Sequence, residues 1–265
     1  MPELRVNGVS LYYEEHGAGE PIVCIHGTGS STLLWRDAAL KLAGHGRAIV
    51  YDRRGFSRSE RPEPLLLDVH RHADDAAALL DALDAAPAVV IGRSHGGEVA
   101  VDLALRYPDR VRALALLEGG ALSLSPAFRR WLADFHGALY AAAGTDPDAV
   151  GDALLRGVLG EESWRALPQA VRQVFNDNGP AILAEERGGM LDVTAEQLGA
   201  IVQPTLLVAG RDSPPFFAEA MELMAAALPS AEVEWVGGGH LVDPAHPAVL
   251  AFVDDVLART DRADG

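Results

Sequence analysis

Residues 88–106 combine a strand, a tight turn and a helix within one short segment. The apolar run Ala88–Ile91 leads into the turn Gly-Arg-Ser-His-Gly at residues 92–96, and a helical pattern follows from Glu98 to Arg106. This turn matches the pattern G-x-S-x-G, in which glycines on both sides of a strained serine let a strand and a helix approach closely. Such a turn holds the hydroxyl of Ser94 clear of the sheet, next to the amides that begin the helix. The segment therefore predicts a nucleophilic serine. The alternative is a glycine-rich turn that only joins two elements.

The rest of the chain repeats this alternation of short apolar runs with longer helical patterns. Strands are expected near residues 4–6, 11–15, 22–25, 48–51, 88–91, 113–117, 205–208 and 233–236. Further helices are expected at residues 68–83, 216–228 and 247–258. Regular alternation of this kind is typical of parallel strands covered by helices on both faces. The expected fold class is therefore α/β, with a mostly parallel eight-stranded sheet, helices on both faces and a helical cap insertion.

The cap is expected where the alternation breaks, between residues 122 and 199. We predict an α/β core domain of residues 1–121 and 200–265, and a helical cap of residues 122–199 over the C-terminal edge of the sheet, where open α/β sheets bind ligands. The helical pieces of this segment carry Phe128, Trp131 and Phe135, which we expect to bind substrate. The alternative for these aromatic side chains is a place in the apolar core of the cap. The alternative is a set of helices packed at the side with no role in binding.

Charge and composition exclude several classes of partner. The formal net charge of −16 disfavours nucleic acid and anionic membranes as partners, although it carries no inference about the substrate. The expected partner is a small-molecule substrate. The single cysteine allows no disulfide within one chain. No apolar stretch is long enough for a membrane span, and no basic segment followed by an apolar run begins the chain, so a cytoplasmic protein is expected, as a monomer or homodimer. The histidine spacings predict no metal site, and no phosphate-binding loop is present, so no cofactor is implied.

A serine hydroxyl becomes nucleophilic at neutral pH only beside a base, and His240 is the best candidate. It follows the expected strand at 233–236 through Gly237–Gly239, a flexible run that could bring its ring back over the strand ends. The competing histidines in expected helices or surface turns are interpreted as solvated; they are His45, His70, His72, His136 and His246.

The sequence His-Gly-Thr-Gly at residues 26–29 directly follows the third expected strand. Together with the serine turn, this motif makes the chain resemble the serine hydrolases of the α/β-hydrolase fold family, those with a helical cap, over nearly its full length. The resemblance implies that the backbone N–H groups of Thr28 and His95 form an oxyanion hole. It also implies that Gly27 lies beside the substrate and that His26 ties down its turn through hydrogen bonds.

The carboxylate that orients the histidine of such a triad has two candidates. In the family it usually follows the seventh strand as the Asp of G-x-x-D, but here Ser213 occupies that place and Asp212 comes one residue early. The family's second location, as in haloalkane dehalogenases and zearalenone-type lactonases, is the end of the sixth strand, where Glu118 follows an apolar run. A buried carboxylate there needs a partner such as His240, so we favour Glu118 over Asp212. The alternative for Glu118 is a structural salt bridge or an exposed strand end.

The expected function is a serine hydrolase that cleaves a carboxylic ester or lactone of a small hydrophobic molecule through an acyl-enzyme. Ser94, where an aspartate nucleophile would stand, argues against the epoxide hydrolase and haloalkane dehalogenase members of the family. The same triad also serves C–C bond hydrolases, thioesterases and cofactor-free haloperoxidases, because fold and triad do not fix the substrate. A non-catalytic small-molecule receptor on the hydrolase fold is the alternative from a different class.

Overall fold

A single sheet of eight strands runs through the computed structural model, which describes residues 3–146 and 149–263. The strands are β1 (Glu3–Val6), β2 (Val9–His16), β3 (Pro21–Ile25), β4 (Arg47–Tyr51), β5 (Ala88–Arg93), β6 (Val111–Leu117), β7 (Thr205–Gly210) and β8 (Ala231–Val236). Their order across the sheet is β1-β2-β4-β3-β5-β6-β7-β8. The neighbours from β4 to β8 run parallel, whereas β2 pairs antiparallel with both β1 and β4. The predicted fold class is confirmed, and each expected strand overlaps an observed one.

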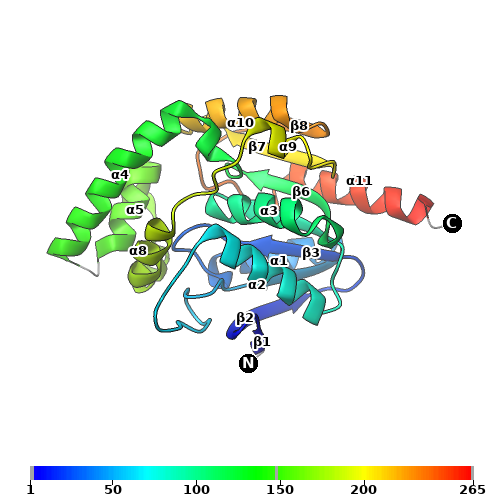
Figure 1. The fold of residues 1–265 in the computed structure, drawn as a ribbon, viewed down its shortest axis with the longest axis horizontal. Coiled ribbons are helices and arrows are strands. Elements are labelled where there is room, and N and C mark those ends of the chain that lie inside the picture. The colour runs from blue at the N-terminus through cyan, green and yellow to red at the C-terminus, as the bar shows by residue number, and fades with distance from the viewer. Residues whose placement is uncertain (1–2, 147–148, 264–265) are drawn as a thin grey trace.

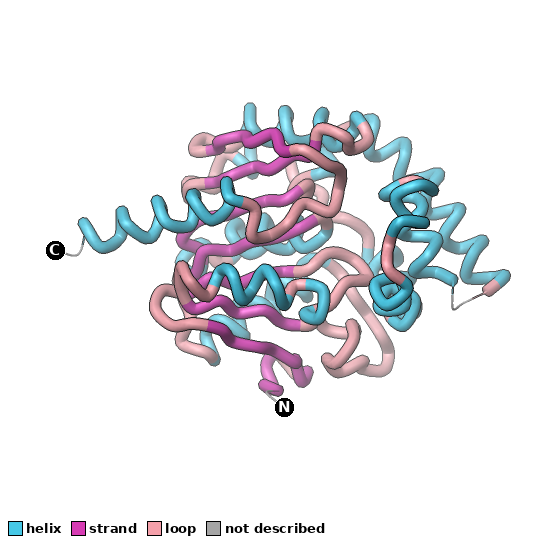
Figure 2. Tube along the Cα trace, turned by 180° about the vertical axis from the view of Figure 1, so that it is seen from behind, coloured by secondary structure: helices cyan, strands magenta, loops and turns pink. Residues whose placement is uncertain are grey.

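Helices cover both faces of the sheet because its central strands are apolar on both sides. All residues of β5 are buried, and alternation along the strand sends Val90 to one core and Ile91 to the other. The first face is covered by α2 (Val69–Ala82), α3 (His95–Arg106) and α10 (Pro215–Ala227), and the second by α1 (Arg36–Leu42) and α11 (Pro247–Ala263). Short 3-10 turns lie at η1 (Thr32–Leu34) and η2 (Pro108–Arg110). Figures 1 and 2 show the three layers from opposite sides.

Between β6 and β7 the chain leaves the sheet and forms the segment that we call the cap. Its elements are η3 (Leu122–Leu124), α4 (Pro126–Thr145), α5 (Val150–Leu159), α6 (Glu161–Ala166), α7 (Gln169–Asp177), α8 (Gly179–Gly188) and α9 (Ala195–Leu198). Most of these helices share an apolar cluster that contains Phe135, Leu154 and Phe175, together with Phe56 and Leu67 from the core domain. Figure 1 shows α4, α5 and α8 beyond the end of the sheet toward which β6 points. The cap thus lies over the carboxyl ends of the parallel strands.

Six residues of the chain lie outside the described part. They are residues 1–2 and 264–265 of the predicted core domain and residues 147–148 of the predicted cap. Within the described residues, no helix combines the length and the apolar character that crossing a bilayer requires.

Candidate active site

Ser94 occupies the turn between β5 and α3 in a strained backbone conformation. Its φ of 55° and ψ of −128° are rare for a residue with a side chain, and such strain concentrates at functional sites. A Cβ at Gly96 would collide with the carbonyl oxygen of Ile25, and one at Gly92 would collide with the backbone of Gly96. The backbone N–H of Ser94 donates to the carbonyl oxygen of Leu117 on β6, 3.0 Å away. Glycine at both positions therefore allows the tight junction that lifts Ser94 to the end of the sheet.

His240 follows β8 and contacts a carboxylate from the end of β6. Its Nδ1 lies 3.2 Å from Oε2 of Glu118, while Oε1 of Glu118 accepts a hydrogen bond of 2.6 Å from the backbone N–H of Gly210. Glu118 is fully buried and has a φ of 47°, a second strained residue beside the site. The ring of Phe217 stacks on the imidazole with 4.4 Å between ring centroids. The contact with Glu118 and the stacking with Phe217 together restrain the orientation of the imidazole ring.

Asp212, the alternative carboxylate, makes a different set of contacts. Its side chain is exposed, and its Oδ2 accepts a hydrogen bond of 3.1 Å from the backbone N–H of Gly238. The backbone N–H of Asp212 donates in turn to the carbonyl oxygen of Gly238, 3.0 Å away. Asp212 therefore holds the glycine turn that precedes His240, while Glu118 contacts the imidazole itself.

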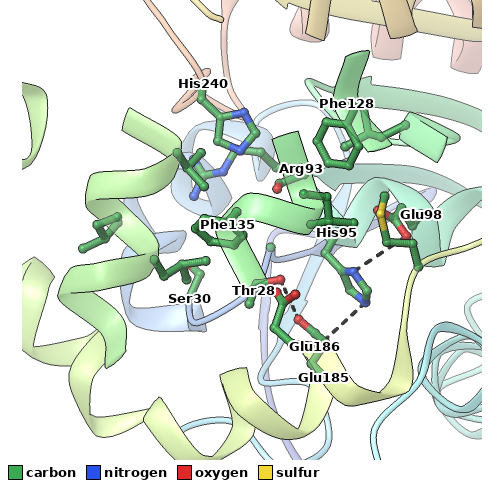
Figure 3. A pocket seen from close by; sticks show the side chains of 18 of the residues that line it. Thr28, Ser30, Arg93, His95, Glu98, Phe128, Phe135, Glu185, Glu186 and His240 are labelled. Atoms are coloured by element: carbon green, nitrogen blue, oxygen red, sulfur yellow. Dashed lines mark hydrogen bonds and ion pairs between the residues drawn. The ribbon is translucent and has the colours of Figure 1, made fainter. Parts of the chain in front are cut away.

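Ser94 and His240 line one cavity of about 100 Å³ at the boundary between core and cap. Every other residue that the sequence assigns to oxyanion stabilisation or substrate binding lines the same cavity: Gly27, Thr28, His95, Phe128, Trp131 and Phe135. Figure 3 shows His240, Phe128 and Phe135 around the upper part of this pocket, with Glu185 and Glu186 below Thr28. Trp131 stacks between Phe135 and Phe216, with 4.7 Å between ring centroids in each pair. The pocket therefore has an aromatic wall and a polar end.

His26 makes contacts that fix the turn after β3. Its Nδ1 lies 2.8 Å from the carbonyl oxygen of Gly27, and its Nε2 accepts a hydrogen bond of 2.9 Å from the backbone N–H of Arg53. Because Nε2 accepts, the proton of the neutral ring resides on Nδ1. Burial and the charge of Arg53 hold the pKa of His26 well below its usual value. His26 thus links the ends of β3 and β4.

Several polar residues of the pocket were missed by sequence reasoning. Glu185 and Glu186 come from α8, and His136 comes from α4 and lies 2.5 Å from Glu186. His72 was interpreted as solvated, and this was wrong: it is buried against Glu185. Charged residues on a cap helix resemble an ordinary solvated face, so no local signal distinguishes them. Among the described residues, no group of three His, Cys, Asp or Glu side chains is placed to hold a metal ion.

Glu98, near the start of α3, is a buried carboxyl group in the pocket wall. Burial raises its pKa to about 8, and the nearby charges of Glu185 and Glu186 act in the same direction. A hydrogen bond of 2.9 Å from the backbone N–H of Leu191 opposes this shift only in part. The folded protein therefore holds a proton on Glu98 at neutral pH, whereas the unfolded chain releases it near pH 4.5.

Replacing Glu98 with glutamine is expected to stabilise the protein increasingly as the pH rises. A pKa raised in the folded state contributes stability below pH 4.5 that is lost as the pH rises toward 8, at about 1.4 kcal/mol per pKa unit. Glutamine escapes this loss and can still accept the hydrogen bond from Leu191. Urea unfolding of both proteins at about pH 5, 6.5 and 8 measures the difference. A difference in unfolding free energy that stays constant across this range would show that Glu98 titrates like an exposed carboxyl group.

Comparisons with known proteins give matches over most of the chain. A family model described as the alpha/beta hydrolase fold matches residues 20–243. A 2-hydroxymuconate semialdehyde hydrolase of Pseudomonas sp. (strain CF600) is 29% identical and covers 98% of this chain and 95% of its own. Among solved structures, a thermophilic esterase from Thermogutta terrifontis is similar with a TM-score of 0.79 and 25% identity, over 98% of this chain and 99% of that chain. Est816, described as an N-acyl homoserine lactone degrading enzyme, is similar with a TM-score of 0.65 and 26% identity, over 97% of this chain and 99% of its own.

Proposed function

Because this chain belongs to the alpha/beta hydrolase fold family, we propose that it is a serine hydrolase of carboxylic esters or lactones that works through an acyl-enzyme. The observation that carries the proposal is the contact of the buried Glu118 with His240, which lines the same pocket as the strained Ser94. A base oriented by a buried carboxylate, beside a serine at a strand-to-helix turn, is the arrangement that acyl transfer requires.

The proposed reaction begins when His240 takes the proton of Ser94 and the hydroxyl oxygen attacks the substrate carbonyl. Glu118 accepts from Nδ1–H of His240, which leaves Nε2 free to act as the base and stabilises the imidazolium that forms. The backbone N–H groups of Thr28 and His95 donate hydrogen bonds to the carbonyl oxygen and stabilise the negative charge that develops on it. His240 then gives its proton to the leaving alcohol, and a water molecule activated by the same histidine hydrolyses the acyl-enzyme.

The pocket supports a small, apolar substrate group. The aromatic side chains of Phe128, Trp131 and Phe135 form its wall on the cap side. Its volume of about 100 Å³ is below the roughly 150 Å³ of a cavity that just holds benzene. We therefore propose that short acyl groups, on the scale of acetate and butyrate, fit without displacement of the cap.

Cleavage of a C–C bond with the same three residues is the second candidate. The similarity to 2-hydroxymuconate semialdehyde hydrolase over 98% of this chain supports it. That chemistry needs the same base and oxyanion donors, so the pocket geometry fits both candidates. Separate assays with an ester, a lactone and a C–C substrate of the relative's type distinguish them.

A fluorophosphonate reagent is expected to modify this protein once, at Ser94, and to block hydrolysis of p-nitrophenyl acetate and butyrate in proportion. The reason is that the reagent imitates the acyl transition state and reacts only with an activated serine. Intact-protein mass spectrometry and peptide mapping measure the adduct. The matched control is Ser213→Ala, which removes a serine near the end of β7 and should label at the parental rate. A folded parent protein that neither labels nor hydrolyses any ester or lactone, yet binds such molecules, would support the receptor alternative instead.

A further inference from the structure

One carboxylate of the cap reaches into the core beside the proposed oxyanion hole. Glu185 lies on α8, and its side chain is 1% exposed. Its Oε2 accepts a hydrogen bond of 2.6 Å from the hydroxyl of Thr28, and both of its oxygens accept from the guanidinium of Arg53. Its Oε1 also lies 3.1 Å from Nε2 of His72 and 3.4 Å from Nε2 of His95. Figure 3 shows the contacts with Thr28 and His95.

The charges in this cluster are balanced within it. Burial alone would raise the pKa of Glu185, but the charge of Arg53 holds it well below its usual value. Burial lowers the pKa of His95 to about 4 and also lowers that of His72, so both rings are neutral near pH 7. The result is a buried pair of Glu185 and Arg53 flanked by two neutral imidazoles. The carboxylate is therefore a permanent acceptor for the hydroxyl of Thr28.

The contacts of His26 hold the start of the turn that carries Thr28, but Thr28 itself lies between two glycines. Glycine precedes and follows Thr28, and Gly29 has a φ of 73°. Besides Glu185, a second residue of the cap forms hydrogen bonds with this turn. The side-chain amide of Asn178, immediately before α8, donates to the carbonyl oxygens of Gly29 and Ser30 at 3.0 and 3.3 Å. The turn is thus fastened to α8 near both ends of that helix.

We propose that Glu185 is a positioning residue, which sets the place of the oxyanion turn through the hydroxyl of Thr28. This inference rests on the proposed function, since it concerns the oxyanion hole, in which the backbone N–H groups of Thr28 and His95 donate hydrogen bonds to the substrate oxygen. Stabilisation of a transition state depends on donors held at the correct distance before the reaction begins. Here the correct distance is maintained by a side chain from the cap, so the cap takes part in the chemistry as well as in substrate binding.

The test uses Thr28→Val, which removes the hydroxyl but keeps the backbone N–H and leaves the Glu185–Arg53 pair intact. We expect kcat for p-nitrophenyl butyrate to fall at least 10-fold, yet by less than the roughly 100- to 1,000-fold cost of deleting an oxyanion donor, with KM little changed. The rate of fluorophosphonate labelling should fall in parallel. Thr28→Ser restores the hydroxyl and should recover most of the lost rate. Glu185→Gln is a weaker probe, because it leaves Arg53 buried without its partner and lowers stability.

A matched control is Ser123→Ala, which removes a different side-chain hydrogen bond, from the hydroxyl of Ser123 to the carbonyl oxygen of Leu191. It should lower the melting temperature about as much as Thr28→Val and leave kcat at the parental value. The inference is overturned if Thr28→Val keeps the parental kcat, or if Thr28→Ser is as slow as Thr28→Val. Both results presuppose an active parent protein, so they are distinct from failure of the proposed function, in which the parent itself shows neither turnover nor labelling.

Discussion

Ser94→Ala is expected to lower kcat for ester hydrolysis on the order of a million-fold while the protein stays folded. The substitution removes the only atom that could form the acyl-enzyme in the proposed mechanism. Residual turnover should come from substrate binding and the oxyanion donors alone, which act on a water molecule instead. Alanine is smaller than serine and introduces no polar group, so the strained turn between β5 and α3 should be retained. Stopped assays with p-nitrophenyl acetate and butyrate, together with circular dichroism, measure both expectations.

Ser213→Ala serves as the comparison for this loss, since Ser213 lies outside the residues that line the pocket. Its kcat should stay within a few-fold of the parental value. Equal rates for the parent and Ser94→Ala would refute Ser94 as the nucleophile. In that case the measured hydrolysis would have to come from another group or from a contaminating enzyme.

Glu118→Gln is expected to slow hydrolysis about ten-thousand-fold. Oε1 of Glu118 accepts a hydrogen bond from the backbone N–H of Gly210, so the glutamine will place its carbonyl oxygen there. Its amide NH₂ then faces Nδ1 of His240, which can only accept. The imidazole proton is thereby forced onto Nε2, and the base is lost. The pH dependence of kcat and the rate of fluorophosphonate labelling measure the effect independently of substrate binding.

Asp212→Asn provides the counterpart on the neighbouring strand. Asparagine can still accept the hydrogen bond from Gly238, so the glycine turn should remain and kcat should change only a few-fold. If Asp212→Asn is the slower variant and Glu118→Gln is nearly normal, the acid of the triad follows β7 and the contact between Glu118 and His240 is only structural.

The sheet was predictable because its signal is local. The central parallel strands are buried on both faces, so runs such as Ala88–Ile91 stand out as continuous apolar stretches. The turn at Ser94 was predictable for a similar reason, since only glycine tolerates the close contacts at positions 92 and 96. Both inferences depend on short stretches of chain and on backbone sterics.

The choice between Glu118 and Asp212 depended on geometry that the sequence does not carry. Each follows a parallel strand at the same edge of the sheet, and a loop of three glycines could bring His240 to either. The exact position of each carboxylate along its turn decides which one contacts the imidazole of His240. In the structure, Oε2 of Glu118 lies 3.2 Å from Nδ1 of His240. The pairing of Glu185 with Arg53 could not be predicted from the sequence for a related reason. These residues are 132 positions apart, and helical periodicity alone does not orient a cap helix.

The fastening of α8 to the turn at residues 27–30 has a consequence for how this architecture can be re-engineered. The cap is one insertion between β6 and β7, so it could be replaced as a unit by the cap of another hydrolase. In this protein, a transplanted cap without an acidic group at the position of Glu185 would leave the buried guanidinium of Arg53 without a negatively charged partner. A successful chimera therefore has to carry α8 along with Asn178, or replace Arg53 with a neutral side chain at the same time.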